Sequence, residues 1–145
     1  MRDLPRQLSA DELAELFEGR TAFVERLALV QDPLGRAREV GRALSDEEKT
    51  EVLDAHPAIG GKATSARSQR EQGTDDDPAV LTELAHLNAA YEARFGFRFV
   101  VFVNGRPRRE IVPVLRTRMK RTREEELETA VDELVQIAIN RWHTS

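Results

Sequence analysis

The stretch Asp77–Gly96, with the sequence DPAVLTELAHLNAAYEARFG, decides the fold class of this chain. Asp77 followed by Pro78 favours a helix start, because aspartate caps free amide groups and proline fits the first helical turn. Gly96 favours a helix end. Six residues between them recur at spacings of three and four, which predicts one long helix: Leu81, Leu84, Ala85, Asn88, Tyr91 and Phe95.

The rest of the chain is also predicted to be mostly helical. Ser9 and Ser45 each precede a glutamate by three residues, which is the spacing of a capping box and predicts a helix start. A helix that carries Phe23, Leu27 and Val30 should stop near Asp32-Pro33, since the residue before a proline disfavours the helical region. Further helices are expected over about 63–73, 107–120 and 122–142.

Two features interrupt this helical pattern. Phe97–Val103 is rich in aromatic and β-branched residues, and Asn104-Gly105 resembles a hairpin turn, but no second strand follows. We therefore expect an extended connector there. Pro113 implies that the next helix either kinks or starts at that residue. The expected fold is all-α: a single domain over 1–145, a compact bundle of about seven to eight helices with one short extended connector.

The composition describes a soluble globular protein. Of the 145 residues, 40% are hydrophobic and 33% are charged, and the net charge of −4 gives no electrostatic footprint for nucleic acid. The absence of cysteine excludes disulfides, thiolate nucleophiles and cysteine-based metal sites. The longest apolar runs are too short to cross a membrane, and the N-terminus lacks an apolar signal core, so a cytoplasmic location is expected.

His56, in the run HPAIG at 56–60, has two interpretations. A histidine that follows a helix and precedes a proline can simply stop the helix and cap its last carbonyls. Alternatively, the negative end of the helix dipole favours a protonated imidazole, which is then well placed to give a proton near neutral pH. The dipeptide alone leaves both interpretations open.

The run SQREQ at 68–72 is the second candidate for chemistry. In a helix, Ser68, Glu71 and Gln72 share one face, which could bind a small ligand rich in N–H and C=O groups. The same spacing is also that of a capping box. Glu83-x-x-His86 has the spacing of a di-iron ligand pair, but such sites need a second copy that the sequence lacks. We therefore expect no metal site.

These segments together resemble the OHCU decarboxylases, which act on 2-oxo-4-hydroxy-4-carboxy-5-ureidoimidazoline. The resemblance covers about residues 9–141 and rests on four blocks in order: HPAIG at 56–60, SQREQ at 68–72, LNAAYEARFGFRF at 87–99 and the helical pattern from Ile111 to Ile137. It implies an all-α fold, usually a homodimer, and no cofactor. It further implies a small-molecule substrate, conversion of OHCU to (S)-allantoin and carbon dioxide, and a place as the last of three steps from urate.

The resemblance also implies roles for individual residues. His56 matches the catalytic histidine, Pro57 is a contact beside it, and Ser68, Glu71 and Gln72 match a substrate-contacting helix. Glu71 either orients His56 and keeps it charged or acts on the substrate carboxylate. The backbone amides that match the ligand-binding segment are those of Phe99, Val100, Val101, Phe102 and Val103.

The implied chemistry suits these residue types. Loss of carbon dioxide from OHCU leaves electrons that pass into the ring as an enolate, so no metal or organic electron sink is needed. The protein must stabilise the oxyanion, hold the ring and ureido arm, and deliver a proton to one face. His56 is the expected proton donor. A non-catalytic small-molecule-binding paralogue on the same fold is the alternative hypothesis.

Overall fold

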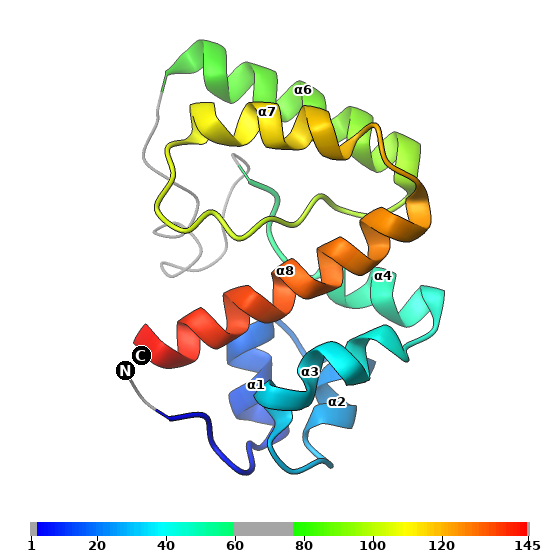
Figure 1. Cartoon of the computed structure of the whole chain (residues 1–145), viewed down its shortest axis with the longest axis vertical. Coiled ribbons are helices and arrows are strands. Elements are labelled where there is room, and N and C mark those ends of the chain that lie inside the picture. Colours follow the sequence, from blue (N-terminus) through cyan, green and yellow to red (C-terminus); the bar gives the residue numbers. More distant parts are fainter. Residues whose placement is uncertain (1–2, 60–76, 145) are drawn as a thin grey trace.

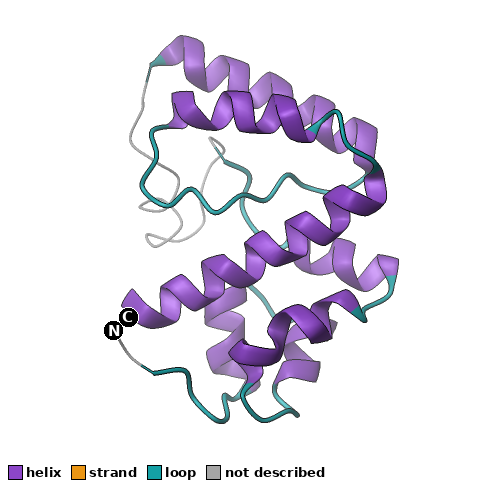
Figure 2. Cartoon of the chain, in the orientation of Figure 1, coloured by secondary structure: helices purple, strands orange, loops and turns teal. Residues whose placement is uncertain are grey.

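The computed structural model describes residues 3–59 and 77–144. Within these ranges the chain forms helices and no strand, as Figure 2 shows, which confirms the all-α prediction. The helices keep the labels of Figure 1: α1 (Ala10–Phe17), α2 (Ala22–Leu27), α3 (Pro33–Arg42), α4 (Asp46–Asp54), α6 (Pro78–Phe95), α7 (Arg108–Arg118) and α8 (Arg123–Thr144).

The long helix α8 crosses the middle of the molecule (Figure 1). It packs against α1, α3 and α4 on one side, while α6 and α7 pack against each other as a second layer. The buried face of α8 is mainly apolar: Leu127, Ala130, Val131, Leu134, Ile137 and Ala138 are all at most 6% exposed, and two buried charged residues, Glu126 and Arg141, lie towards its two ends. Each large apolar side chain buried in this way contributes about 1.5–3 kcal/mol.

Local sequence signals account for most helix ends. The Ser9 hydroxyl accepts from the Glu12 amide at 3.1 Å and the Glu12 carboxylate accepts from the Ser9 amide at 3.0 Å, which completes the predicted capping box. Ser45 and Glu48 repeat this pair of bonds with the same distances. Gly96 ends α6 with φ at 82°, a left-handed conformation that glycine adopts without steric cost.

The prediction for the second and third helices was partly wrong. The structure ends α2 at Leu27, short of Val30, and starts a new helix at Pro33 that the sequence pattern had not indicated. Asp32-Pro33 stops no helix here. Proline occupies the first turn of α3, where its missing N–H has no cost. The helix expected over 63–73 lies outside the described residues.

The extended connector is confirmed and lies between the two layers. Phe97, Phe99 and Val100 are each 1% exposed, so this irregular segment is part of the core. The Tyr91 ring packs edge-on against Phe97 and Phe99, with centroid distances of 5.9 and 5.2 Å. After the connector, α7 starts at Arg108 and runs through Pro113, so a helix start at this proline is ruled out.

Candidate active site

His56 lies just beyond the C-terminal end of α4, next to the capping residue Ala55. Its backbone amide donates to the carbonyl of Leu53 at 3.1 Å, which closes the last turn. The side chain is half-buried, and its Nδ1 atom is buried without a hydrogen-bond partner among the described residues. One ring nitrogen is therefore uncommitted within the part of the chain that the structure describes.

The surroundings of His56 disfavour its protonated form. Burial is the main cause that lowers its pKa from 6.5 to about 4, and the cations Arg141 and Arg98 act in the same direction. The Glu18 carboxylate opposes them. The helix dipole favours the charged form of this imidazole, but these surroundings outweigh it in the free protein. The partial charge at a helix end is smaller than the combined effect of desolvation and two guanidinium groups.

The residues that follow His56 are held by α6. Pro57 is half-buried, and Ile59 is 5% exposed. Asn88, which is 7% exposed on α6, donates from Nδ2 to the Ile59 carbonyl at 2.7 Å. This bond ties the HPAIG run to the second layer of the fold. Ser68, Glu71 and Gln72, which were predicted to share a ligand-binding face, lie outside the described residues.

The connector brings the predicted amide groups into the interior. Phe102 N–H donates to the Glu133 carboxylate of α8 at 3.3 Å. The amides of Val100, Val101 and Val103 have no hydrogen-bond acceptor among residues 3–59 and 77–144. Buried amides of this kind are strong donors, and they favour a negatively charged oxygen.

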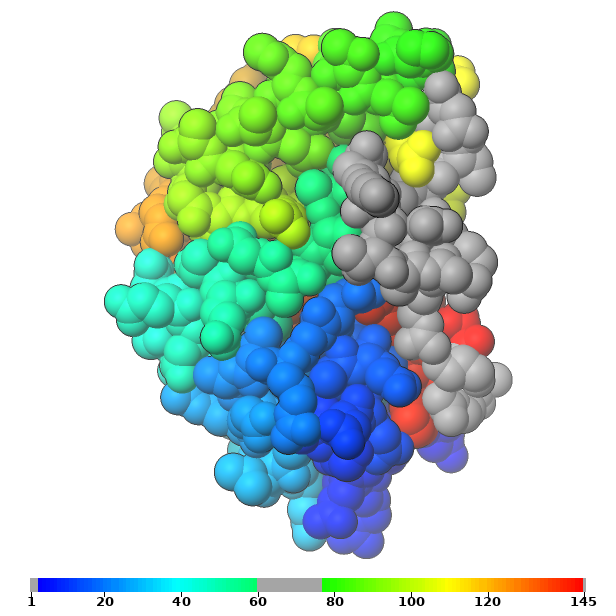
Figure 3. Space-filling model, turned by 180° about the vertical axis from the view of Figure 1, so that it is seen from behind, coloured from blue at the N-terminus to red at the C-terminus, as the bar shows by residue number. Residues whose placement is uncertain are grey.

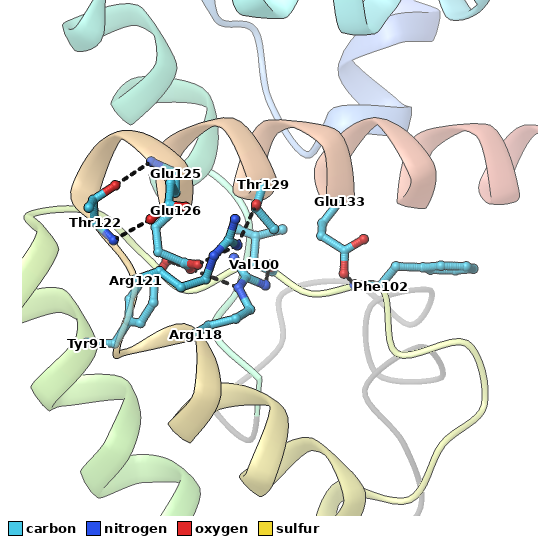
Figure 4. A network of polar contacts seen from close by, with 10 residues as sticks. All are labelled: Tyr91, Val100, Phe102, Arg118, Arg121, Thr122, Glu125, Glu126, Thr129 and Glu133. Carbon is cyan, nitrogen blue, oxygen red and sulfur yellow. Dashed lines mark hydrogen bonds and ion pairs between the residues drawn. The ribbon is translucent and has the colours of Figure 1, made fainter.

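A buried ionic network also contacts the connector, at the carbonyl of Val100 (Figure 4). Arg118 donates from Nη1 to the Val100 carbonyl at 2.7 Å and from Nε to Glu126 at 2.8 Å. The Tyr91 hydroxyl donates to the same carboxylate oxygen at 2.6 Å, and Arg121 pairs with the other oxygen at 3.0 Å. Burial, with the adjacent Glu126 carboxylate, raises the pKa of Tyr91. The network therefore gives one fully buried carboxylate three hydrogen-bond donors, two of them guanidinium groups.

The structure adds residues near His56 that sequence patterns had not singled out. Arg98 reaches the His56 carbonyl from the connector, at 2.7 Å between Nη1 and oxygen. Arg141 is 1% exposed on α8 and pairs with Glu18 at 3.2 Å. One signal was available for Arg98, since it is the single charge in an otherwise apolar run.

The sequence matches a known family across nearly the whole chain. The family profile described as OHCU decarboxylase matches residues 2–143. The chain belongs to the OHCU decarboxylase family. The resemblance stated from the four sequence blocks is thereby confirmed.

Individual members of the OHCU decarboxylase family differ widely in length. The chain is 28% identical to the uric acid degradation bifunctional protein PucL of Bacillus subtilis, over 95% of this chain and 30% of that protein. It is 27% identical to the 2-oxo-4-hydroxy-4-carboxy-5-ureidoimidazoline decarboxylase of Haloferax volcanii, over 88% of this chain and 83% of that protein. The chain thus spans less than a third of the bifunctional relatives that it matches.

The fold agrees with a solved OHCU decarboxylase. A crystal structure of OHCU decarboxylase in the presence of (S)-allantoin superposes with a TM-score of 0.75, covering 89% of this chain and 93% of that chain at 24% identity. This likeness establishes the shared fold.

The remaining sequence candidates have ordinary surroundings in this OHCU decarboxylase fold. Glu83 pairs with Arg116 at 2.9 Å across a shallow groove between α6 and α7. In the described part of the chain, no three histidine, aspartate or glutamate side chains gather as a metal site would need. None of the described helices is long and apolar enough to span a membrane.

Proposed function

We propose that this chain is a cofactor-independent carboxy-lyase that converts OHCU to (S)-allantoin and carbon dioxide. The observation that carries the proposal is the family match over residues 2–143, which includes His56. In this proposal the half-buried His56 supplies a proton-transfer group, the connector amides supply oxyanion donors, and Arg141, which acts on the charge of His56, supplies a cation. Chemistry of this class needs those three components.

The low pKa of His56 shapes the proposed mechanism. In the free protein the imidazole is neutral at pH 7, because its pKa is about 4. The substrate brings a carboxylate, and a negative charge beside the imidazole raises its pKa. We therefore propose that substrate binding is accompanied by uptake of one proton at His56.

The proposed reaction then balances with that one proton. The bond between the ring carbon and the carboxylate breaks, carbon dioxide leaves, and the electron pair passes into the ring as an enolate. Amides within Phe99–Val103 stabilise the negative oxygen. His56 gives its proton to one face of the neighbouring ring carbon, which bears the ureido group, while the hydroxyl proton passes to a ring nitrogen and the carbon that lost carbon dioxide becomes a carbonyl. The product is then a single enantiomer, and the imidazole is neutral again.

The remaining site residues keep the roles that the family resemblance implies. Pro57, Ser68 and Gln72 hold the ring and the ureido arm. Glu71 either orients His56 or acts on the substrate carboxylate. A homodimer, a cytoplasmic location and one domain over 1–145 belong to the same proposal, and light scattering during size exclusion tests the dimer by its doubled mass.

The decisive experiment generates OHCU in place with uricase and hydroxyisourate hydrolase and follows circular dichroism. We expect the wild-type chain to give rapid formation of (S)-allantoin, and His56→Ala to lose it while keeping the helical spectrum. Slow racemic decay with the wild-type protein would overturn the proposed function. Full activity in His56→Ala would overturn the role of this histidine.

A further inference from the structure

Arg98 makes an unusual set of contacts with the end of α4. Its Nη1 atom donates to the carbonyls of Asp54 at 3.0 Å and His56 at 2.7 Å. Its backbone amide donates to the Asp54 carboxylate at 3.0 Å. These three bonds join a residue of the connector to the two residues around the helix end, across 42 to 44 positions of sequence.

The contacts satisfy groups that a helix leaves open. The last carbonyls of an α-helix have no partner within the helix, and a cation near them interacts favourably with the dipole. Hydrogen bonds from a guanidinium are charge-assisted and are stronger than those between neutral groups. Arg98 therefore fixes the backbone at His56 more tightly than the single bond to Leu53 would.

The residues on either side of Arg98 are buried in the core. Its neighbours Phe97 and Phe99 are each 1% exposed and pack against Tyr91. The end of α6 and the start of the connector lie against α4 on the face seen in Figure 3. One residue thus links the backbone of His56 to the segment that carries the proposed amide donors.

We propose that Arg98 is a positioning residue, which sets His56 against the connector amides by holding the His56 carbonyl. This inference rests on the proposed function for its effect on turnover. The effect of Arg98 on the pKa of His56 does not depend on the proposed function. A purely structural role would stabilise the fold without altering either property.

The test compares Arg98→Met, Arg98→Lys and the control Arg36→Met. Arg36 is exposed on α3 and pairs with Glu39, so the control also removes a guanidinium group, but from the surface. We expect Arg98→Met to lower kcat by about 10- to 100-fold with a much smaller change in KM, because a displaced catalytic group costs rate more than binding. Arg98→Lys should recover part of the loss, and the control should match wild type.

The second readout is the titration of the His56 Cε1–H signal by NMR, which needs no turnover. Arg98, Arg141 and Glu18 are the charged groups that influence this imidazole from the connector, α8 and the end of α1. Removing the Arg98 cation should move the midpoint to higher pH, whereas Arg36→Met should leave it in place.

The outcomes separate the two proposals. Wild-type kcat together with an unchanged titration in Arg98→Met overturns the positioning role. If Arg98→Met does not fold, Arg98→Gln, which also removes the cation, takes its place: wild-type kcat, KM and titration in that variant assign Arg98 to stability alone and also overturn the role. If the wild-type protein forms no (S)-allantoin, the proposed function fails, and the His56 titration still decides whether Arg98 sets this imidazole.

Discussion

Arg118 and Val100 are joined by a 2.7 Å hydrogen bond from the guanidinium Nη1 to the backbone carbonyl. The bond ties α7 to the buried connector, and the same guanidinium lies 4.6 Å from the Phe99 ring centroid. Arg118 is only 6% exposed, and the Glu126 carboxylate at 2.8 Å compensates its charge. The proposed amide donors are thus positioned by a buried ion pair from outside the connector.

The ion pair between Arg118 and Glu126 predicts the effect of removing the Glu126 carboxylate. Glu126→Ala should lower the free energy of unfolding by about 3–5 kcal/mol, because it leaves buried guanidinium charge uncompensated. Urea unfolding measures the change. Glu124→Ala, at an exposed position of the first turn of α8, is the control and should differ from wild type by less than about 0.5 kcal/mol. Equal losses of unfolding free energy in Glu126→Ala and Glu124→Ala would show that the buried network does not stabilise the fold.

Asn88 offers a test of how the HPAIG run is held. Asn88→Ala removes the 2.7 Å bond to the Ile59 carbonyl and leaves a cavity, so we expect a loss of about 2–3 kcal/mol. Asn88→Leu also removes Oδ1, which is buried without a partner among the described residues, and it fills the space. Thermal melts should therefore rank wild type above Asn88→Leu and Asn88→Leu above Asn88→Ala. A melting temperature of Asn88→Leu at or above that of the wild-type protein would mean that filling the space, and not the hydrogen bond to Ile59, governs this site.

The pKa of His56 predicts a pH dependence of stability. Its value is about 4 in the folded protein and near 6.5 in the unfolded chain, so between these values the unfolded state binds more protons. This group stabilises the fold fully above about pH 6.5 and loses that contribution as the pH falls through 6.5 towards 4. Allowing for solvent screening of a half-buried group, the loss is about 2 kcal/mol.

Unfolding by urea at pH 7, 5.5 and 4.5 measures this contribution. His56→Gln carries no titrating ring, so its stability should fall less steeply over that range than that of the wild-type protein. Parallel pH curves for the two proteins would contradict the lowered pKa.

Glu18 combines a strained backbone with a buried partner. It adopts the left-handed region with φ at 64°, while its carboxylate pairs with Arg141 at 3.2 Å. Glu18→Gly relieves about 1 kcal/mol of backbone strain, but it removes this carboxylate from a guanidinium that is 0% exposed. We expect a net loss of stability by calorimetry, together with a lower NMR midpoint for His56, because the Glu18 charge raises its pKa.

Asp32→Gly is the matched control for the strain term. Asp32 has φ at 52° and makes no capping bond with its side chain. Its replacement should change stability by no more than about 1 kcal/mol, since strain relief and the added freedom of glycine in the unfolded chain oppose each other. A gain in stability for Glu18→Gly would show that the pair with Arg141 contributes less than the strain.

Local signals in the sequence determined the helices wherever both ends were marked. The capping boxes at Ser9 and Ser45 and the Asp77-Pro78 start depend on atoms within three residues of each other, so spacing alone specifies them. The missed helix α3 shows the limit of such signals. Pro33 can follow one helix or begin another, and only packing against α8 decides between them.

His56 itself was visible in the sequence, and so was the family to which the chain belongs. Its surroundings were not, because the groups that act on it come from distant parts of the chain: Glu18 from α1, Arg98 from the connector and Arg141 from α8. Desolvation and the distances between charges are properties of the folded interior. The sequence by itself determined the all-α class and the histidine at the helix end, whereas the tertiary structure alone decided that this histidine is neutral and that Arg98 holds it.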